Sequence, residues 1–128
     1  MKIESLDHIV LTVHDLIETC TFYEQILGMQ VISFGEGRLA LKFGNQKINL
    51  HQVGKEQPPT AANPQPGSAD FCMITDEPIH KVRNHLIKFG IEILSGPVRK
   101  EGANGPIQSI YFNDPSGNLL EVSNYLKH

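Results

Sequence analysis

A chain of 128 residues with 40% hydrophobic and 20% charged residues has the composition of one globular domain, or of two small modules sharing a core. Its formal net charge of −3 and the lack of any basic run argue against nucleic acid and anionic membrane surfaces as partners. No apolar run reaches the roughly 18 residues of a membrane-spanning helix, and Met1–Glu4 lacks the apolar core of a signal peptide, so we expect a cytoplasmic location.

The first half of the chain predicts one strand, one helix and three further strands. Residues 6–13 alternate weakly and are rich in β-branched side chains, which indicates a strand. Asp15 is placed to cap the helix that follows, with Glu18 as its capping-box partner, and Gly28 is placed to end it. Three more strands, separated by glycine turns, are expected over 29–34, 37–43 and 46–53.

A proline-rich segment, residues 54–67, then predicts a linker between module one (1–53) and module two (68–128). Module two repeats the order of module one. Its helix is expected to begin near Pro78 and to end at Gly90. Its strands are expected over 68–75, 91–98, 107–113 and 119–125. The polar, glycine-rich segment 99–106 is expected to be a mobile flap.

The two halves also align residue by residue. A constant offset brings His8 onto Asp70 and Gly28 onto Gly90. A unit this small cannot bury its own apolar face, so two units must pair. The sequence therefore predicts an α+β fold, in which two βαβββ modules form a curled mixed sheet within one domain, residues 1–128.

Four side chains of metal-ligand type are expected on one face of this sheet. Alternation along four strands places one of them per strand on the face away from the helices: His8, His51, Asp70 and Glu121. If the sheet curls, this face lines a cup. Histidines and carboxylates that converge on a concave face fit a divalent metal site. For Asp70, an alternative is an acceptor that orients a histidine ligand.

Three further residues are expected to face the cup and bind substrate. They are Arg38 in module one and Ser109 and Tyr111 in module two. Arginine can fork onto a carboxylate or a phosphate, although most arginines are simply solvated. Arg38 therefore favours a small anionic substrate with adjacent oxygens.

The two cysteines predict neither a metal site nor a disulfide. Cys20 and Cys72 fit no zinc-type spacing, and two cysteines are too few for a disulfide framework. Because free cysteine is among the most buried residue types, we expect two buried, reduced thiols, in keeping with the cytoplasm.

Two motifs resemble those of a known family. The run Asp114–Glu121 reads DPSGNLLE and resembles the closing motif of the vicinal oxygen chelate superfamily, and Leu6–Leu11, LDHIVL, resembles its first strand. That superfamily contains glyoxalase I, extradiol dioxygenases, fosfomycin-resistance transferases and bleomycin-binding proteins, and the double βαβββ order is its fold. The resemblance covers essentially the whole chain and is nearest to the small glyoxalase-domain proteins of the kind called glyoxalase-domain-containing protein 5.

The resemblance implies a metal-dependent, glyoxalase-like lyase or isomerase, and the family habit suggests a homodimer. A divalent ion would chelate two vicinal oxygens of a small-molecule substrate and polarise them as a Lewis acid. Glu121 or Asp70 would act as the catalytic carboxylate that moves a proton. Histidine and carboxylate ligands suit zinc, nickel, manganese or iron without choosing among them.

The chain also departs from the family pattern, which keeps two alternatives open. At the positions that resemble His51 and Asp70 of this chain, glyoxalase I has a glutamate on the fourth strand and a histidine on the fifth. One alternative is a non-catalytic small-molecule-binding or antibiotic-resistance protein, although bleomycin-binding relatives lack metal ligands. The other is a ring-cleaving dioxygenase, which needs an acid–base histidine in the cup that this sequence does not clearly supply.

Overall fold

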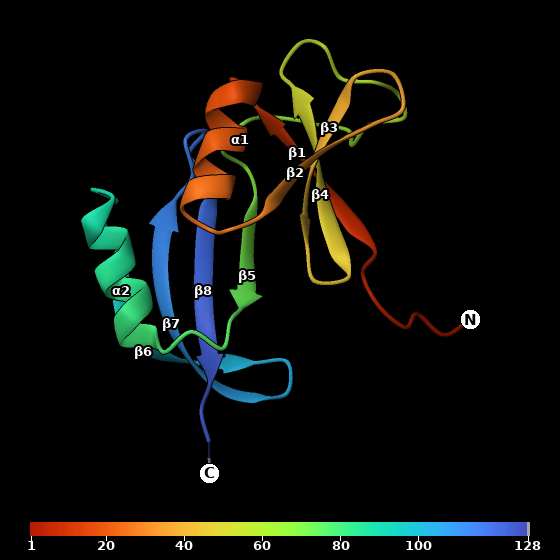
Figure 1. The fold of residues 1–128 in the computed structure, drawn as a ribbon. Coiled ribbons are helices and arrows are strands. Elements are labelled where there is room, and N and C mark those ends of the chain that lie inside the picture. Colours follow the sequence, from red (N-terminus) through yellow and green to blue (C-terminus); the bar gives the residue numbers. More distant parts are fainter. Residues whose placement is uncertain (128) are drawn as a thin grey trace. The chain divides into compact units, whose positions relative to one another are not determined.

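The computed structural model describes residues 1–127 and divides into two compact units, residues 1–68 and the chain from Ala69 onward. We call them module one and module two, and each is described by itself. In Figure 1, module one runs from red to yellow-green and module two from green to blue. The elements of module one are β1 (His8–Val13), α1 (Leu16–Gln25), β2 (Gln30–Phe34), β3 (Arg38–Phe43) and β4 (Gln46–Gln52). Those of module two are β5 (Asp70–Ile74), α2 (Ile79–Lys88), β6 (Ser95–Gly102), β7 (Gly105–Asn113) and β8 (Leu119–Tyr125).

Each module carries its own four-stranded mixed sheet, and the two sheets have the same topology. The strand order is β1-β4-β3-β2 in module one and β5-β8-β7-β6 in module two. In each sheet the first pair is parallel and the other pairs are antiparallel. The predicted α+β fold of two βαβββ modules is therefore confirmed, with one sheet per module.

The helices begin and end where the sequence signals stand. The Asp15 side chain accepts a hydrogen bond from the Glu18 backbone N–H at 2.9 Å, which satisfies one of the free donors at the start of α1. Gly28 and Gly90 follow α1 and α2 with φ values of +67° and +72°. Glycine adopts this left-handed conformation without a steric cost, so both positions end a helix as predicted.

The buried core of each module lies between its helix and one face of its sheet. Helix α1 packs on β2, β3 and β4, and α2 packs on β6 and β7. The fully buried side chains of module one include Val13, Tyr23, Leu41 and Ile48, and those of module two include Leu86, Ile110, Phe112 and Leu120. Each such side chain contributes about 1.5–3 kcal/mol relative to exposure. The opposite face of each sheet is thereby left for polar residues.

The prediction of a mobile flap over 99–106 is wrong. This segment belongs to a regular hairpin, in which Arg99, Lys100 and Glu101 of β6 pair with β7. The reason is the tight turn at Ala103–Asn104 that precedes Gly105, whose φ is +127°. The Tyr125 hydroxyl further holds the turn by accepting a hydrogen bond from the Asn104 N–H at 3.1 Å. An Asn-Gly pair between two strand-forming runs is a strong hairpin signal.

Residues 91–94, predicted as the start of a strand, precede β6, which begins at Ser95. Between Gln52 and Asp70 the described chain forms no helix or strand. Among the described residues, no helix has both the length and the apolar character needed to cross a membrane.

Candidate metal and substrate site

Glu121 lies at the centre of the open face of module two. Its neighbours Leu120 and Val122 are buried on the side of α2, so alternation turns Glu121 to the opposite face. The register places Cys72 of β5 on one side of Glu121 and Tyr111 of β7 on the other. The carboxylate is therefore half-buried within the sheet surface.

Two buried serines hold one oxygen of this carboxylate. Ser109 and Ser123 face each other on β7 and β8, and neither side chain is exposed. The Ser109 hydroxyl donates to Glu121 Oε2 at 2.5 Å, and Ser123 donates to the same oxygen at 3.4 Å. The two hydroxyls also lie 2.6 Å apart. Both serine hydroxyls therefore hold the same oxygen, Oε2, of the Glu121 carboxylate.

The charge of Glu121 and partial desolvation both shift the pKa values of Tyr111 and Cys72. Desolvation raises the pKa of the Tyr111 hydroxyl, and the negative charge of Glu121 adds to the effect. Desolvation likewise raises the pKa of the Cys72 thiol, whose sulfur lies 3.3 Å from the Ser123 hydroxyl. Cys20 is buried as predicted, but the prediction that Cys72 is buried is wrong, because it lies exposed on the open face. Both residues are free thiols.

The DPSGN turn fixes where Asp70 and Glu121 stand relative to each other. Asp114 Oδ1 accepts hydrogen bonds from the backbone N–H groups of Ser116 and Asn118 at 2.9 and 3.0 Å. Asp114 Oδ2 accepts a bond from the Asn118 side chain at 2.8 Å. Asn118 Oδ1 in turn accepts from the Ala69 N–H at 3.0 Å, which ties the start of β5 to the start of β8. Asp70 consequently pairs with Leu119, which lies two residues before Glu121 on β8. The Asp70 side chain is exposed.

His8 is the ligand type that module one presents most openly. It is exposed at the first position of β1, and its Nδ1 lies 2.8 Å from Asp7 Oδ1. This hydrogen bond from His8 holds the pKa of Asp7 below its usual value. A carboxylate on Nδ1 fixes the imidazole and presents Nε2 outward, which is the arrangement of metal-ligating histidines.

His51 lies on the same face but not beside His8. The parallel register pairs His8 with Lys47 and pairs His51 with Thr12. At about 3.3 Å per residue, the four positions between their levels correspond to roughly 13 Å along the strands. Two ligands of one ion must both reach within about 2.0–2.3 Å of it. The structure therefore does not bring the two histidines together within module one.

Asn49 is a candidate site residue that the sequence analysis did not identify. It pairs with Val10, as Glu121 pairs with Cys72, so Asn49 occupies in module one the place of Glu121 in module two. Asn49 Oδ1 and His51 Nε2 are both buried, and neither has a hydrogen-bond partner in the described structure. The only signal for Asn49 in the sequence is a polar residue between Ile48 and Leu50, which does not reveal its level along the sheet.

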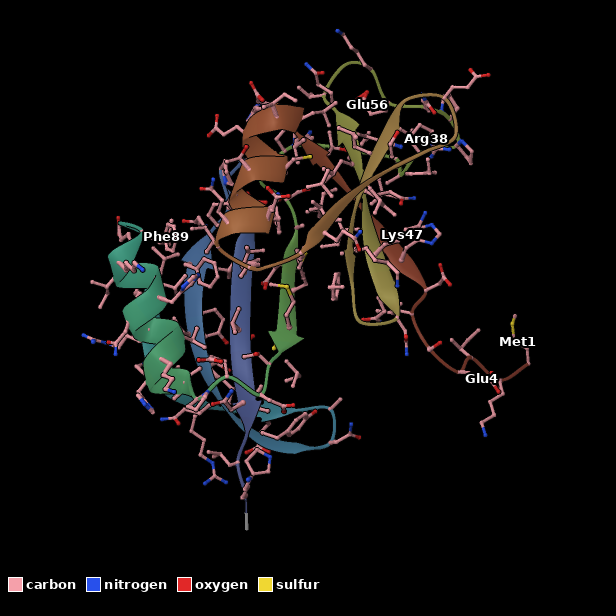
Figure 2. The ribbon with its side chains drawn as sticks, in the orientation of Figure 1. Met1, Glu4, Arg38, Lys47, Glu56 and Phe89 are labelled. Carbon is pink, nitrogen blue, oxygen red and sulfur yellow. The ribbon has the colours of Figure 1, made fainter. Side chains whose placement is uncertain are left out.

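Arg38 and Lys47, both labelled in Figure 2, belong to module one. Both cations lie over the ring of Phe34 on the open face of this module. The register pairs Phe34 with Arg38 across β2 and β3, and pairs Ala40 with Asn49 across β3 and β4. All these residues therefore share the face of His8. Within residues 1–127, no group of three or more histidine, cysteine, aspartate or glutamate side chains is placed to hold a metal ion.

Comparison with known proteins identifies the family. The model of the glyoxalase/bleomycin resistance protein/dioxygenase superfamily matches residues 5–122, so the chain belongs to this superfamily, as the motifs suggested. It is 52% identical to a glyoxalase domain-containing protein, RDO1, of Mycosarcoma maydis, over 98% of this chain and 70% of that protein. It is 51% identical to the virulence protein STM3117 of Salmonella typhimurium, over 98% of this chain and 88% of the relative.

Solved structures of similar proteins share this fold. An integron cassette protein from the mobile metagenome of V. cholerae superposes with a TM-score of 0.96 at 55% identity, over 98% of both chains. The crystal structure of the Salmonella virulence protein superposes with a TM-score of 0.97, over 98% of this chain and all of the other. The names of these relatives do not specify a chemical reaction.

Proposed function

We propose that the protein is a metal-dependent enzyme of the glyoxalase type, which acts as a lyase or isomerase on a small anionic substrate with vicinal oxygens. Members of the superfamily generally depend on a divalent ion. The observation that carries the proposal is the orientation of two donor groups. Asp7 holds His8 through Nδ1, and Ser109 holds Glu121 through Oε2. Ligands fixed by such partners are typical of metal sites.

In this proposal His8 and Glu121 hold the ion, and Asp70 stands beside them as a third ligand or as an orienting acceptor. The bound ion would supply Lewis-acid polarisation of the substrate oxygens. Zinc, nickel, manganese and iron all suit these donors. His51 remains a candidate metal ligand in this proposal. On β4, however, Asn49 and not His51 occupies the position that corresponds to Glu121 of module two.

The two carboxylates of module two, Glu121 and Asp70, have different roles in this proposal. Glu121 is fixed by two hydroxyl groups, which suits a constant ligand. Asp70 is exposed at the start of β5 and is free to approach and leave a substrate. Asp70 is therefore the better candidate to move a proton, and Arg38 is the candidate to bind the anionic group.

The test is metal titration of chelator-treated protein by calorimetry. His8→Ala and Glu121→Ala should each weaken binding by at least about 100-fold, because loss of an orienting partner alone costs 10- to 100-fold. The exposed residues His80 and Glu92 provide matched controls, since His80→Ala and Glu92→Ala should change nothing. His51→Ala decides whether His51 is a ligand. Turnover of a methylglyoxal–glutathione adduct by the metal-loaded protein then tests the reaction class.

We further propose a homodimer. Val10 and Ile74 lie on the open faces of β1 and β5 and are 47% and 52% exposed. Single exposed apolar residues are ordinary on a protein surface, so the dimer rests on the superfamily, whose members often form dimers. Sedimentation should give twice the chain mass at micromolar concentration, and a monomer would contradict the proposal.

A further inference from the structure

Three side chains on neighbouring strands of module one form a compact basic cluster. Phe34 of β2 supplies an aromatic ring, with Lys47 Nζ of β4 3.9 Å from its centroid and Arg38 Cζ of β3 4.7 Å from it. All three residues are half-buried. Both distances end on one ring, so the two positive charges lie near each other on the open face.

Among the described residues, neither of these two charges is held in an ion pair, although the Asp7 carboxylate acts on Lys47 electrostatically. Within residues 1–127, ion pairs shorter than 4.0 Å join His8 to Asp7 and Arg99 to Glu101, and none involves Arg38 or Lys47. The ring offers each cation a weak electrostatic attraction, but it carries no net charge. Two like charges in a partly desolvated place repel each other, and a bound anion would relieve that repulsion.

A neighbouring lysine shows what an ordinary cation on this face does. Lys42 pairs with Lys47 across β3 and β4, so both side chains share the open face. Lys42 Nζ donates a hydrogen bond to the Gly44 carbonyl at 2.9 Å. Lys42 therefore has a backbone acceptor close by, whereas Lys47 points to the ring beside Arg38.

We propose that Arg38, Lys47 and Phe34 form an oxyanion-binding subsite that takes the anionic group of the substrate. Its place in catalysis rests on the proposed function, but its binding of an anion does not need the metal ion. Arginine forks onto two oxygens and lysine adds a point charge, while Phe34 keeps both side chains extended over the sheet. Two cations that are in no ion pair among the described residues match a doubly charged tetrahedral oxyanion better than a single carboxylate.

The experiment measures binding of inorganic phosphate and of acetate to the metal-free protein, in chelator and at low salt, by calorimetry and NMR shifts. Phosphate should bind more tightly than acetate. Arg38→Gln and Lys47→Gln should each weaken phosphate binding by about 10-fold or more, as loss of 1.4 kcal/mol does. Lys42→Gln, the matched control, removes the same charge from the same face and should weaken binding less than Arg38→Gln or Lys47→Gln, because Lys42 Nζ is bonded to the Gly44 carbonyl and not placed over the Phe34 ring.

Phe34→Leu keeps an apolar side chain but removes the aromatic face, and it should weaken phosphate binding while circular dichroism stays unchanged. Absence of phosphate binding by the wild type would overturn the proposal, and so would equal weakening by Lys42→Gln. Because no metal is present, the result is independent of the metal titration. A protein that binds phosphate through Arg38 and Lys47 but no divalent ion through His8 and Glu121 keeps the subsite and loses the proposed function.

Discussion

Replacing Ser109 with alanine tests the arrangement around Glu121 without touching a proposed ligand. The Ser109 hydroxyl is fully buried and takes part in two short hydrogen bonds, to Glu121 Oε2 at 2.5 Å and with Ser123 at 2.6 Å. The substitution deletes one oxygen atom and leaves the backbone register of β7 unchanged. Its effect should therefore report the hydrogen bonds alone.

The expected magnitude follows from the two bonds. A hydrogen bond to a charged group contributes about 1.5–3 kcal/mol, and one between neutral groups contributes about 0.5–1.5 kcal/mol. Glu121 is half-buried, so water compensates part of the first loss. We expect the free energy of unfolding to fall by about 2–3 kcal/mol.

The assay is urea unfolding at neutral pH, followed by circular dichroism. Ser33→Ala is the control, because Ser33 is exposed on β2, and it should change stability by less than about 0.5 kcal/mol. In a Glu121→Ala background, Ser109→Ala should cost at least about 1 kcal/mol less, since contacting residues couple by 0.5–3 kcal/mol. A cost below about 0.5 kcal/mol in the wild type, or an equal cost in both backgrounds, would refute the reasoning.

Three other features of module two give further predictions. Asp114→Ala should lower the free energy of unfolding by about 3 kcal/mol or more in urea, because it removes a buried carboxylate that accepts three hydrogen bonds. Gly96→Ala should destabilise far more than Gly44→Ala in the same assay, because a Cβ at Gly96 would collide with the Ser109 carbonyl, whereas nothing lies near one at Gly44. The raised pKa of Cys72 keeps its thiol neutral, so alkylation by iodoacetamide, followed by mass spectrometry, should reach its half-maximal rate only above pH 9.0. The Cys72 thiol loses its proton at a lower pH in the unfolded chain than in the folded one, so it lowers the free energy of unfolding as pH rises above 9.0. Alkylation of Cys72 at the rate of an ordinary thiol at pH 8 would contradict the raised pKa.

The fold was predictable because its signals are local and repeated. Asp15, Gly28 and Gly90 mark helix boundaries through capping and left-handed backbone geometry, and alternation on β8 separates Glu121 from the buried Leu120. The hairpin of β6 and β7 did not follow from composition, because glycine and polar residues are also typical of mobile loops. The Asn104–Gly105 pair is instead a turn signal between two strands.

The site was only partly predictable, because alternation gives the face of a residue but not its level along the sheet. The level of His51 follows from the parallel pairing of β1 with β4, which joins segments far apart in the sequence. The level of Glu121 depends on the long-range bond between Asn118 and Ala69. For Cys72 alternation was the better guide, since it puts the thiol on the exposed face with Asp70, whereas the general tendency of cysteine to be buried pointed the wrong way.

The most direct test of the central claim is a crystal structure of the protein loaded with zinc or manganese, with anomalous data collected at the metal edge. The proposal predicts one ion for each pair of modules, with His8 and Glu121 at ligand distances of about 2.0–2.3 Å for a zinc-like ion. Anomalous density confined to other residues, with the His8 and Glu121 side chains more than about 8 Å apart and so outside any shared ligand shell, would contradict it.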